Sequence, residues 1–202
     1  MADWVFLRHG QSVANAAGRV TGHADSPLTG LGRSQAAEAA SVLADVPFQR
    51  AFSSHLSRAV ETARIVLEGR GLTALQAPQL AERDVGEFGG RLLRELRDTQ
   101  ENELLLGWFT HPPGGESLAD VALRSLPFLA GLPPVEGPTL VVAHGGLLRV
   151  VVGLLDGLPI EEGARWKLPN CEPMTRTLEP DTFSKLVAEH GPRLFPAGAS
   201  HA

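Results

Sequence analysis

With 202 residues, 43% of them hydrophobic and 20% charged, the chain is long enough to bury a sizeable core and has the composition of an ordinary globular protein. Its formal net charge of -5 argues against a nucleic-acid partner and against binding to an anionic membrane surface. No apolar run is long enough to cross a bilayer, and the sequence does not open with a secretion signal, so we expect a cytoplasmic protein. Cys171 is the only cysteine, which excludes an intrachain disulfide.

The first third of the chain alternates between strand and helix patterns. The apolar run from Trp4 to Leu7 predicts a buried strand, and Arg50 to Ser53 predicts a shorter one. Between them a helix is expected after the N-cap residue Thr29, because one face repeats at helical spacing and comprises Leu31, Gln35, Ala39, Val42, Leu43 and Val46. A second helix is expected from about Ser57 to Leu67, with an apolar stripe of Ala59, Ala63, Val66 and Leu67.

The pattern changes after Leu80. A glycine-rich turn at residues 86–90, a helical stretch at about 91–106 and a Pro-Gly break at 112–115 indicate a helical insertion at about 83–116. The elements expected beyond it are a helix that opens at Ser117, a buried strand from Leu140 to Ala143, and a very apolar helix from Leu147 to Leu155. A loose tail is expected from about residue 191. No linker divides the chain, so residues 1–202 are expected to form a single domain.

Two histidines follow strands that are far apart in the sequence. His9 comes directly after the strand predicted at residues 4–7, and His144 directly after the strand predicted at 140–143. The carboxyl ends of parallel strands meet at one edge of an α/β sheet, which is where ligands bind, so both histidines are expected to share one pocket. The insertion is expected to lie over that pocket.

The residue types near these histidines suit phosphoryl transfer. A neutral imidazole can attack phosphorus when a hydrogen bond at its other ring nitrogen fixes the tautomer. The transfer also requires neutralisation of charge on the phosphoryl oxygens, for which Arg8 and Arg58 are the candidates. A carboxylic acid with a raised pKa could protonate the leaving oxygen and later accept a proton from water, and Glu82 is the candidate for this role.

The segments that carry these residues resemble the histidine phosphatase superfamily, also called the phosphoglycerate mutase-like family. The resemblance extends from residue 5 to about 170 and follows the family's order through segments 6–15, 21–36, 53–63, 80–86, 113–117 and 142–146. It implies a three-layer α/β/α sandwich with a mainly parallel central sheet. It also implies that His9 becomes phosphorylated, that Glu82 is the proton donor, and that no metal or cofactor is required. The residues that it assigns to the phosphoryl group are Arg8, Asn15, Arg58 and His144.

Within this family, a phosphatase is favoured over a mutase. The glycolytic mutases carry Glu-Arg-His-Tyr-Gly where this chain has Glu-Arg-Asp-Val-Gly at residues 82–86. They also have an arginine-rich segment before three prolines, where this chain has only two prolines at 112–113. Phosphatases of the family often have Trp-Glu-Gly where this chain has Phe-Gly-Gly at 88–90, which is a departure on that side. A cofactor-dependent phosphoglycerate mutase is therefore the alternative function.

The expected partner is a small-molecule phosphate monoester, whose two negative charges would be balanced by two arginines and a partly charged His144. The insertion could contact the organic part of the substrate. Arg91, Arg94 and Arg97 would form a basic stripe for an acidic group, and Trp108 with Phe109 would stack on a nucleoside-like group. A phosphoglycerate derivative, a sugar phosphate and α-ribazole phosphate all stay open as substrates.

Two other functional classes stay open. His9, His144 and Glu82 are also ligand types for zinc or non-haem iron in a metal-dependent hydrolase or oxygenase, although two nearby arginines would repel a cation. A non-catalytic phospho-ligand-binding protein is the second class. Three further histidines have no assigned partner and are expected at the surface or in loops: His23, His55 and His111. The apolar helix after His144 suits burial in the core or at a homodimer interface equally well.

Overall fold

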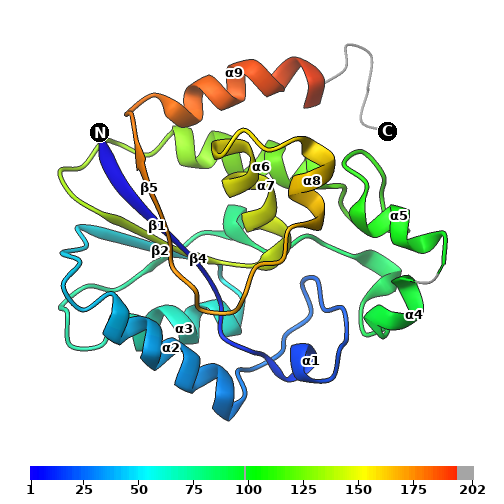
Figure 1. Cartoon of the computed structure of the whole chain (residues 1–202), viewed down its shortest axis with the longest axis horizontal. Coiled ribbons are helices and arrows are strands. Elements are labelled where there is room, and N and C mark those ends of the chain that lie inside the picture. Colours follow the sequence, from blue (N-terminus) through cyan, green and yellow to red (C-terminus); the bar gives the residue numbers. More distant parts are fainter. Residues whose placement is uncertain (98, 195–202) are drawn as a thin grey trace.

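A five-stranded sheet lies at the centre of the computed structural model, which describes residues 1–97 and 99–194 (Figure 1). The strand order is β3-β2-β4-β1-β5, and all neighbouring pairs are parallel except the antiparallel pair β1 and β5. The expected α/β architecture with a mainly parallel sheet is confirmed. The strands are β1 (Ala2–Arg8), β2 (Arg50–Ser53), β3 (Leu75–Gln76), β4 (Thr139–Ala143) and β5 (Met174–Leu178).

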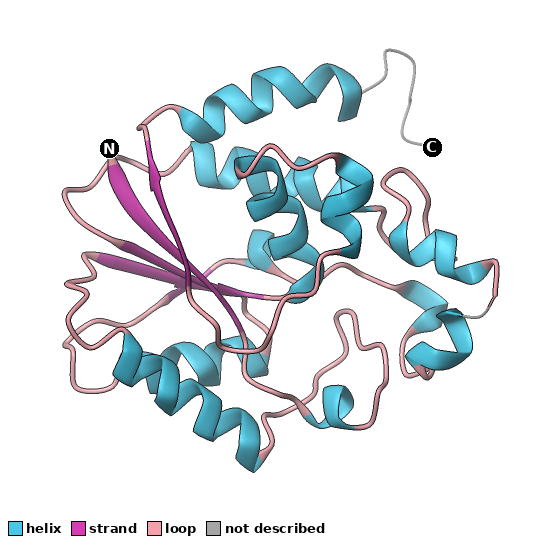
Figure 2. Ribbon diagram, viewed as in Figure 1, coloured by secondary structure: helices cyan, strands magenta, loops and turns pink. Residues whose placement is uncertain are grey.

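Helices cover both faces of the sheet and complete three layers (Figure 2). One face carries α2 (Gly30–Val42) and α3 (Ser57–Val66), and the other carries α6 (Leu118–Ala130), α7 (Gly145–Leu155) and α9 (Thr182–Leu194). Successive side chains of a strand point to opposite faces, so Val5 and Leu7 belong to the apolar cluster under α2 and α3, whereas Phe6 belongs to the cluster under α6 and α7. The remaining helices are α1 (Val13–Ala16), α4 (Leu93–Arg97), α5 (Glu101–Leu106) and α8 (Ile160–Arg165), with 3-10 turns η1 (Pro78–Leu80) and η2 (Gly86–Phe88).

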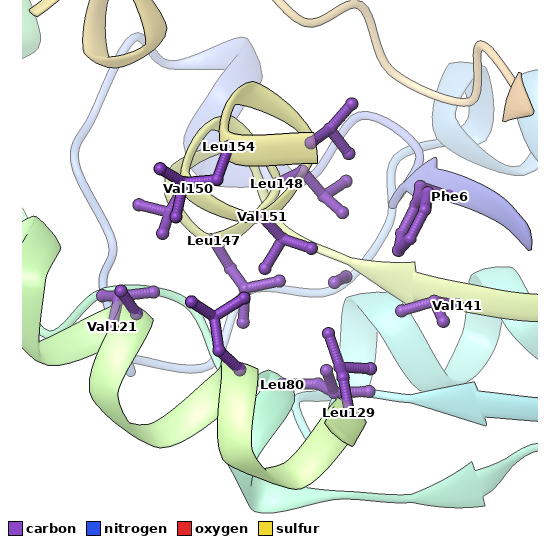
Figure 3. Close-up of a cluster of buried hydrophobic side chains, with 14 of the residues drawn as sticks. Phe6, Leu80, Val121, Leu129, Val141, Leu147, Leu148, Val150, Val151 and Leu154 are labelled. Atoms are coloured by element: carbon purple, nitrogen blue, oxygen red, sulfur yellow. The ribbon is translucent and has the colours of Figure 1, made fainter. Parts of the chain in front are cut away.

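Helix α7 is buried on almost all sides. Figure 3 shows Leu147, Leu148 and Val151 packed among side chains of the sheet and of neighbouring helices, including Phe6 and Val141. All five of these side chains are fully buried. Removing a large aliphatic side chain from such a site costs about 2–5 kcal/mol. The apolar character of α7 is therefore accounted for within one chain.

The predicted apolar face of α2 is partly wrong. Leu31 and Val42 are 55% and 72% exposed, and the face that packs inward consists of the small residues Gly32, Ala36 and Ala39. The physical reason is the close approach of the helix to the loop after β1, because a Cβ on Gly32 would stand 2.1 Å from the carbonyl oxygen of Gln11. The expected N-cap is confirmed, since the Thr29 hydroxyl accepts the N–H of Gly32.

The segment at residues 83–116 contains two short helices where the sequence predicted one. The chain turns between α4 and α5, where the Thr99 hydroxyl donates to the Leu96 carbonyl and accepts the N–H of Glu101. Such local bonds compete with the continuing hydrogen bonds of a helix. After the break at 112–115, α6 begins as expected, with a capping box between Ser117 and Asp120.

The last part of the chain was the least well predicted. Strand β5 and helix α9 were not expected, and α9 continues to Leu194, so the first residues of the expected tail are helical. Residues 195–202 of that tail lie outside the described residues. Among the helices that the structure describes, none is both long enough and apolar enough to cross a membrane.

Candidate active site

The register of β1 and β4 brings the two histidines together. Arg8 pairs with Ala143, and the backbone N–H of His9 donates to the Ala143 carbonyl at 3.0 Å. The next residue on each strand therefore stands at the same edge of the sheet. The imidazole rings of His9 and His144 have their centroids 5.0 Å apart, tilted by 59°.

His9 is held as a neutral imidazole with one nitrogen available. It is buried, and its Nδ1 lies 2.7 Å from the carbonyl oxygen of Gly10. A carbonyl oxygen only accepts, so Nδ1–H donates and Nε2 keeps its lone pair. Burial lowers the pKa of His9 well below 6.5, and the neighbouring His144, Arg58 and Arg8 lower it further. This tautomer and charge state are those of a nucleophile.

His144 is the N-cap residue of α7 and is completely buried. Neither ring nitrogen has a hydrogen-bond partner among the residues that the structure describes. Burial lowers its pKa well below 6.5, assisted by Arg58, Arg124 and Arg8. A partly charged His144 is expected with a phosphate ester bound; in the protein alone, this environment disfavours the imidazolium. A bound anion would raise the pKa of both imidazoles.

Arg8 and Arg58 are fixed by carbonyl groups on one side and are unpartnered on the other. Nη1 of Arg8 donates to the Leu168 carbonyl at 2.6 Å, and Arg58 donates to the carbonyls of Gly22 at 2.8 Å and Ala24 at 3.0 Å. The Nε atom of each arginine is buried and has no partner among the described residues. Buried donors of a charged group are costly to leave unsatisfied, so this arrangement favours an anion bound between the two guanidinium groups.

Glu82 accepts hydrogen bonds from two backbone groups, the N–H of Arg83 at 2.9 Å and that of Gly146 at 3.0 Å. Burial raises the pKa of Glu82, but the Arg83 hydrogen bond, the charge of Arg58 and the Gly146 hydrogen bond together lower it below 4.5. The expected raised pKa is therefore not found in the protein alone. A phosphate dianion between Arg8 and Arg58 would screen these cations from the carboxylate and raise its pKa.

Asn15 lies on α1, where its Oδ1 accepts the N–H of Ser12 at 3.3 Å in a capping box. The capping box therefore uses the Oδ1 atom of Asn15 and not its side-chain amide nitrogen. Asn15, Arg8 and Glu82 line one pocket of about 210 Å³, which continues along apolar side chains toward the insertion. The other residues that line it are Arg19, Val20, Thr21, Gly22, Arg83, Val85, Leu93, Leu105, Leu106, Leu118, Gly145, Gly146, Arg149 and Ala164.

The basic stripe expected on the insertion does not face this pocket. Arg91 forms two hydrogen bonds with the Glu101 carboxylate, whereas Arg94 and Arg97 are exposed. Trp108 is buried in the core and Phe109 is 55% exposed, and neither of them is among the residues that line the pocket. These two suggestions for substrate contacts are not supported.

Two of the unassigned histidines have partners. Nε2–H of His23 donates to the backbone carbonyl of Glu82 at 2.6 Å, and His111 pairs with Asp120 at 2.7 Å. His23 therefore connects the loop that holds Arg58 to the segment that carries Glu82. His55 is exposed.

The sequence interpretation missed Arg149. This residue is half-buried on α7, lines the pocket, and donates from Nε to the Trp166 carbonyl at 2.6 Å. It is the only charged residue in the apolar run 147–155, and that isolation was a signal available in the sequence. No group of three or more His, Cys, Asp and Glu side chains within the described parts of the chain is placed to hold a metal ion.

The chain is similar to known proteins over most of its length. A family model described as the histidine phosphatase superfamily (branch 1) matches residues 4–188. One relative, named 2,3-bisphosphoglycerate-dependent phosphoglycerate mutase 2, from Gloeobacter violaceus, is 36% identical over 93% of this chain and 91% of its own length.

Two solved structures are also similar to this chain. A mycobacterial glucosyl-3-phosphoglycerate phosphatase in complex with VO3 has a TM-score of 0.79 and 32% identity, covering 87% of this chain and 92% of the other. An alpha-ribazole phosphatase from Shigella flexneri has a TM-score of 0.74 and 29% identity, covering 88% and 91%.

Proposed function

The chain belongs to the histidine phosphatase superfamily (branch 1), and we propose that it is a phosphatase that hydrolyses a small-molecule phosphate monoester through a phosphohistidine on His9. The observation that carries the proposal is the set of unsatisfied buried donors on Arg8, Arg58 and His144, which surround the neutral His9. A phosphoryl group would satisfy them all.

In the first step, Nε2 of His9 forms a bond to phosphorus while the bond from phosphorus to the ester oxygen breaks. Arg8, Arg58 and His144 hold the phosphoryl oxygens, and Asn15 adds a hydrogen bond. Protonated Glu82 donates its proton to the departing oxygen. In the second step, water attacks the phosphohistidine, Glu82 accepts the proton of that water, and the N–P bond breaks to return His9 and release inorganic phosphate.

A phosphoglycerate mutase is the second candidate, because several curated relatives carry that name. The surroundings of Arg83 favour the phosphatase. This arginine is part of the mutase pattern, but here its guanidinium donates to the backbone carbonyls of Leu104, Leu105, Thr110 and Glu116. Its donors are therefore committed to holding the insertion, not to a second phosphate.

The test is phosphate release from a panel of monoesters by the chelator-treated protein. We expect release by the native chain, none by His9→Ala, and near-native release by the matched control His55→Ala, which changes an exposed histidine. Acid-labile phosphate trapped on the native chain alone would support the covalent intermediate.

Three other outcomes would each point to a different function or mechanism. Isomerisation of 3-phosphoglycerate that depends on added 2,3-bisphosphoglycerate, without phosphate release, would replace the phosphatase by the mutase. Binding of inorganic phosphate without any turnover would indicate a phospho-ligand-binding protein. Turnover that appears only after a metal is added back would contradict the proposed mechanism.

A further inference from the structure

The peptide group between Glu82 and Arg83 is held at both of its ends. Its carbonyl oxygen accepts Nε2–H of His23 at 2.6 Å and Nη2–H of Arg124 at 3.0 Å. Its N–H group donates to the Glu82 carboxylate at 2.9 Å. Because a peptide group is planar, the side chains that orient its carbonyl also orient its N–H. The position of the Glu82 carboxylate is therefore linked to residues that do not touch the carboxylate itself.

This peptide N–H has a strong influence on the carboxylate. Burial raises the pKa of Glu82, and the Arg83 N–H is the strongest of the groups that lower it. Donors that bind the carbonyl of a peptide polarise the group and strengthen its N–H as a donor. The bonds to the Glu82 carbonyl thus affect both the direction and the charge state of the group proposed to donate a proton.

Arg124 of α6 is the firmer of the two anchors. Its Nη1 also donates to the Gln79 carbonyl at 2.8 Å, so one guanidinium group holds the chain on both sides of residues 80–81. The side chain of Arg124 is 21% exposed and that of His23 is 42% exposed, so water competes less for the bonds of Arg124. Arg124 is not among the residues that line the pocket beside Glu82. Its hydrogen bonds reach the site through the backbone of Glu82.

Glu116 fixes the plane of the Arg124 guanidinium group. Its carboxylate accepts Nε–H of Arg124 at 2.8 Å and Nη2–H at 3.0 Å, and such paired bonds orient a guanidinium fork strictly. The same carboxylate accepts the N–H of Asp84 at 2.9 Å, two residues after Glu82. Glu116 lies in segment 113–117, for which the proposed phosphatase mechanism has no role. These contacts give it one, as the link between Arg124 and the chain that carries Glu82.

We infer that Arg124, oriented by Glu116, is a positioning residue for the proton donor: it holds the peptide group after Glu82 so that the carboxylate faces the departing oxygen. This inference rests on the proposed function, in which Glu82 protonates that oxygen. Arg124 itself contacts neither the phosphoryl group nor the leaving group. Its effect on the rate therefore depends on how much the departing oxygen needs a proton.

The test compares phenyl phosphate with p-nitrophenyl phosphate, which differ in one nitro group and carry a poor and a good leaving group. We expect Arg124→Gln to lower kcat for phenyl phosphate by about tenfold, because a misplaced acid loses part of its contribution. For p-nitrophenyl phosphate the loss should be about threefold or less, since its leaving group departs readily as an anion. Arg124→Lys keeps the positive charge that acts on His144 but loses the fork, and should show the same selective loss at a smaller size.

A double-mutant cycle separates positioning from folding. In the Glu82→Gln background, Arg124→Gln should not lower kcat for phenyl phosphate further, because the group that it positions can no longer donate a proton. The matched control Arg176→Gln breaks an equivalent pair of hydrogen bonds, from a guanidinium on β5 to Asp156, and should leave both rates unchanged. The unfolding free energy of each variant is measured alongside its activity.

Equal losses on both esters in Arg124→Gln, or a loss that adds to that of Glu82→Gln, would show a purely structural role and overturn the inference. Glu116→Gln keeps the size of the side chain and weakens the paired bonds to Arg124, so it provides the same test if the Arg124 variants do not fold. It should slow phenyl phosphate selectively, and equal losses on both esters would again overturn the inference.

Failure of the proposed function has a different result. Absence of phosphate release by the native chain, or equal losses on both esters in Glu82→Gln, would remove the role of Glu82 and this inference with it. A selective loss in Glu82→Gln beside an unselective loss in Arg124→Gln would overturn this inference alone.

Discussion

The carboxylate of Glu82 accepts the backbone N–H of Gly146 at 3.0 Å, which ties the segment before the insertion to the first turn of α7, two residues after His144. A Cβ on Gly146 would stand 2.4 Å from Oε1 of Glu82, so the contact depends on glycine at this position. The N–H groups at the start of a helix carry partial positive charge, which favours the ionised carboxylate. The group proposed to donate a proton is therefore held as its conjugate base until an anion arrives.

Because Glu82 is proposed to protonate the departing oxygen, its contribution to the rate should depend on how readily the leaving group departs as an anion. We expect Glu82→Gln to lower kcat for alkyl phosphates by about a hundredfold or more, because an alkoxide needs a proton in order to depart. The loss should be much smaller for p-nitrophenyl phosphate, whose leaving group is a stable anion. Steady-state phosphate release from both substrates measures the ratio.

The control for this experiment is Glu87→Gln, which removes an exposed carboxylate nearby on η2. It should change neither rate appreciably. If Glu82→Gln slowed both classes of ester by the same factor, Glu82 would be acting on the phosphoryl pocket as a whole and not on the leaving oxygen.

Arg58→Ala should lower kcat/KM by about a hundredfold or more for every monoester, because the guanidinium group is proposed to hold the phosphoryl oxygens that all of them share. Arg64→Ala, which removes an exposed arginine from the same helix α3, is the matched control. Arg58 also donates to the carbonyls of Gly22 and Ala24, so the unfolding free energy of each variant must be measured alongside activity. A stable Arg58→Ala protein with near-native turnover would contradict the assignment.

The loop after His9 should tolerate no side chain at Gly10. A Cβ there would stand 2.3 Å from the carbonyl oxygen of Gly32, which is backbone and cannot move aside as a side chain could. We expect Gly10→Ala to lower the melting temperature and abolish activity together, because the strain falls on the contact between the His9 loop and α2. Gly30→Ala is the control, since nothing lies within 4 Å of a Cβ at that position and the residue is in the first turn of α2. Equal melting temperatures for the two variants would count against this close contact.

The parts of the fold that were predicted from sequence are those set by neighbouring residues. Thr29 and Ser117 were recognised as caps because a cap is completed within four residues of the chain. The strands before His9 and His144 were recognised because they are buried on both faces and are therefore continuously apolar. The closeness of the two imidazole rings, whose centroids are 5.0 Å apart, followed from the general geometry of parallel strands.

The features of the fold and of the site that the sequence did not predict depend on contacts between distant segments. Strand β5 is an edge strand, and its alternating Thr175, Arg176 and Thr177 give a weak apolar signal. The contact between His23 and the Glu82 carbonyl joins residues far apart in the sequence, and no local pattern marks it. The hydrogen bond from the neighbouring Arg83 N–H lowers the pKa of Glu82, but the further lowering by the charge of Arg58 and by the N–H of Gly146 arises only when the folded chain brings these groups near.

Stability should decrease as the pH falls below about 6.5, the ordinary pKa of a histidine, because His9 and His144 are buried as neutral groups. Both have folded-state pKa values well below 6.5. Between those values and 6.5 the unfolded chain binds protons that the native chain does not, so the unfolding free energy falls with falling pH. Each histidine contributes at most about 1.4 kcal/mol per pH unit within this window.

Urea unfolding at about pH 7.5 and pH 5.5 measures this effect. The carboxyl groups with shifted pKa values act at lower pH, because their ordinary pKa values are 4.5 for Glu82 and Glu101 and 3.8 for Asp120 and Asp181. We expect His144→Asn to lose less unfolding free energy than the native chain over this interval, because one buried neutral imidazole has been removed. His55→Ala, at an exposed position, should keep the native dependence. Added inorganic phosphate should reduce the loss in the native chain, because an anion beside the imidazoles favours their protonated forms. A pH dependence that is the same in His144→Asn and in the native chain would mean that His144 already binds its proton in the folded protein at pH 5.5.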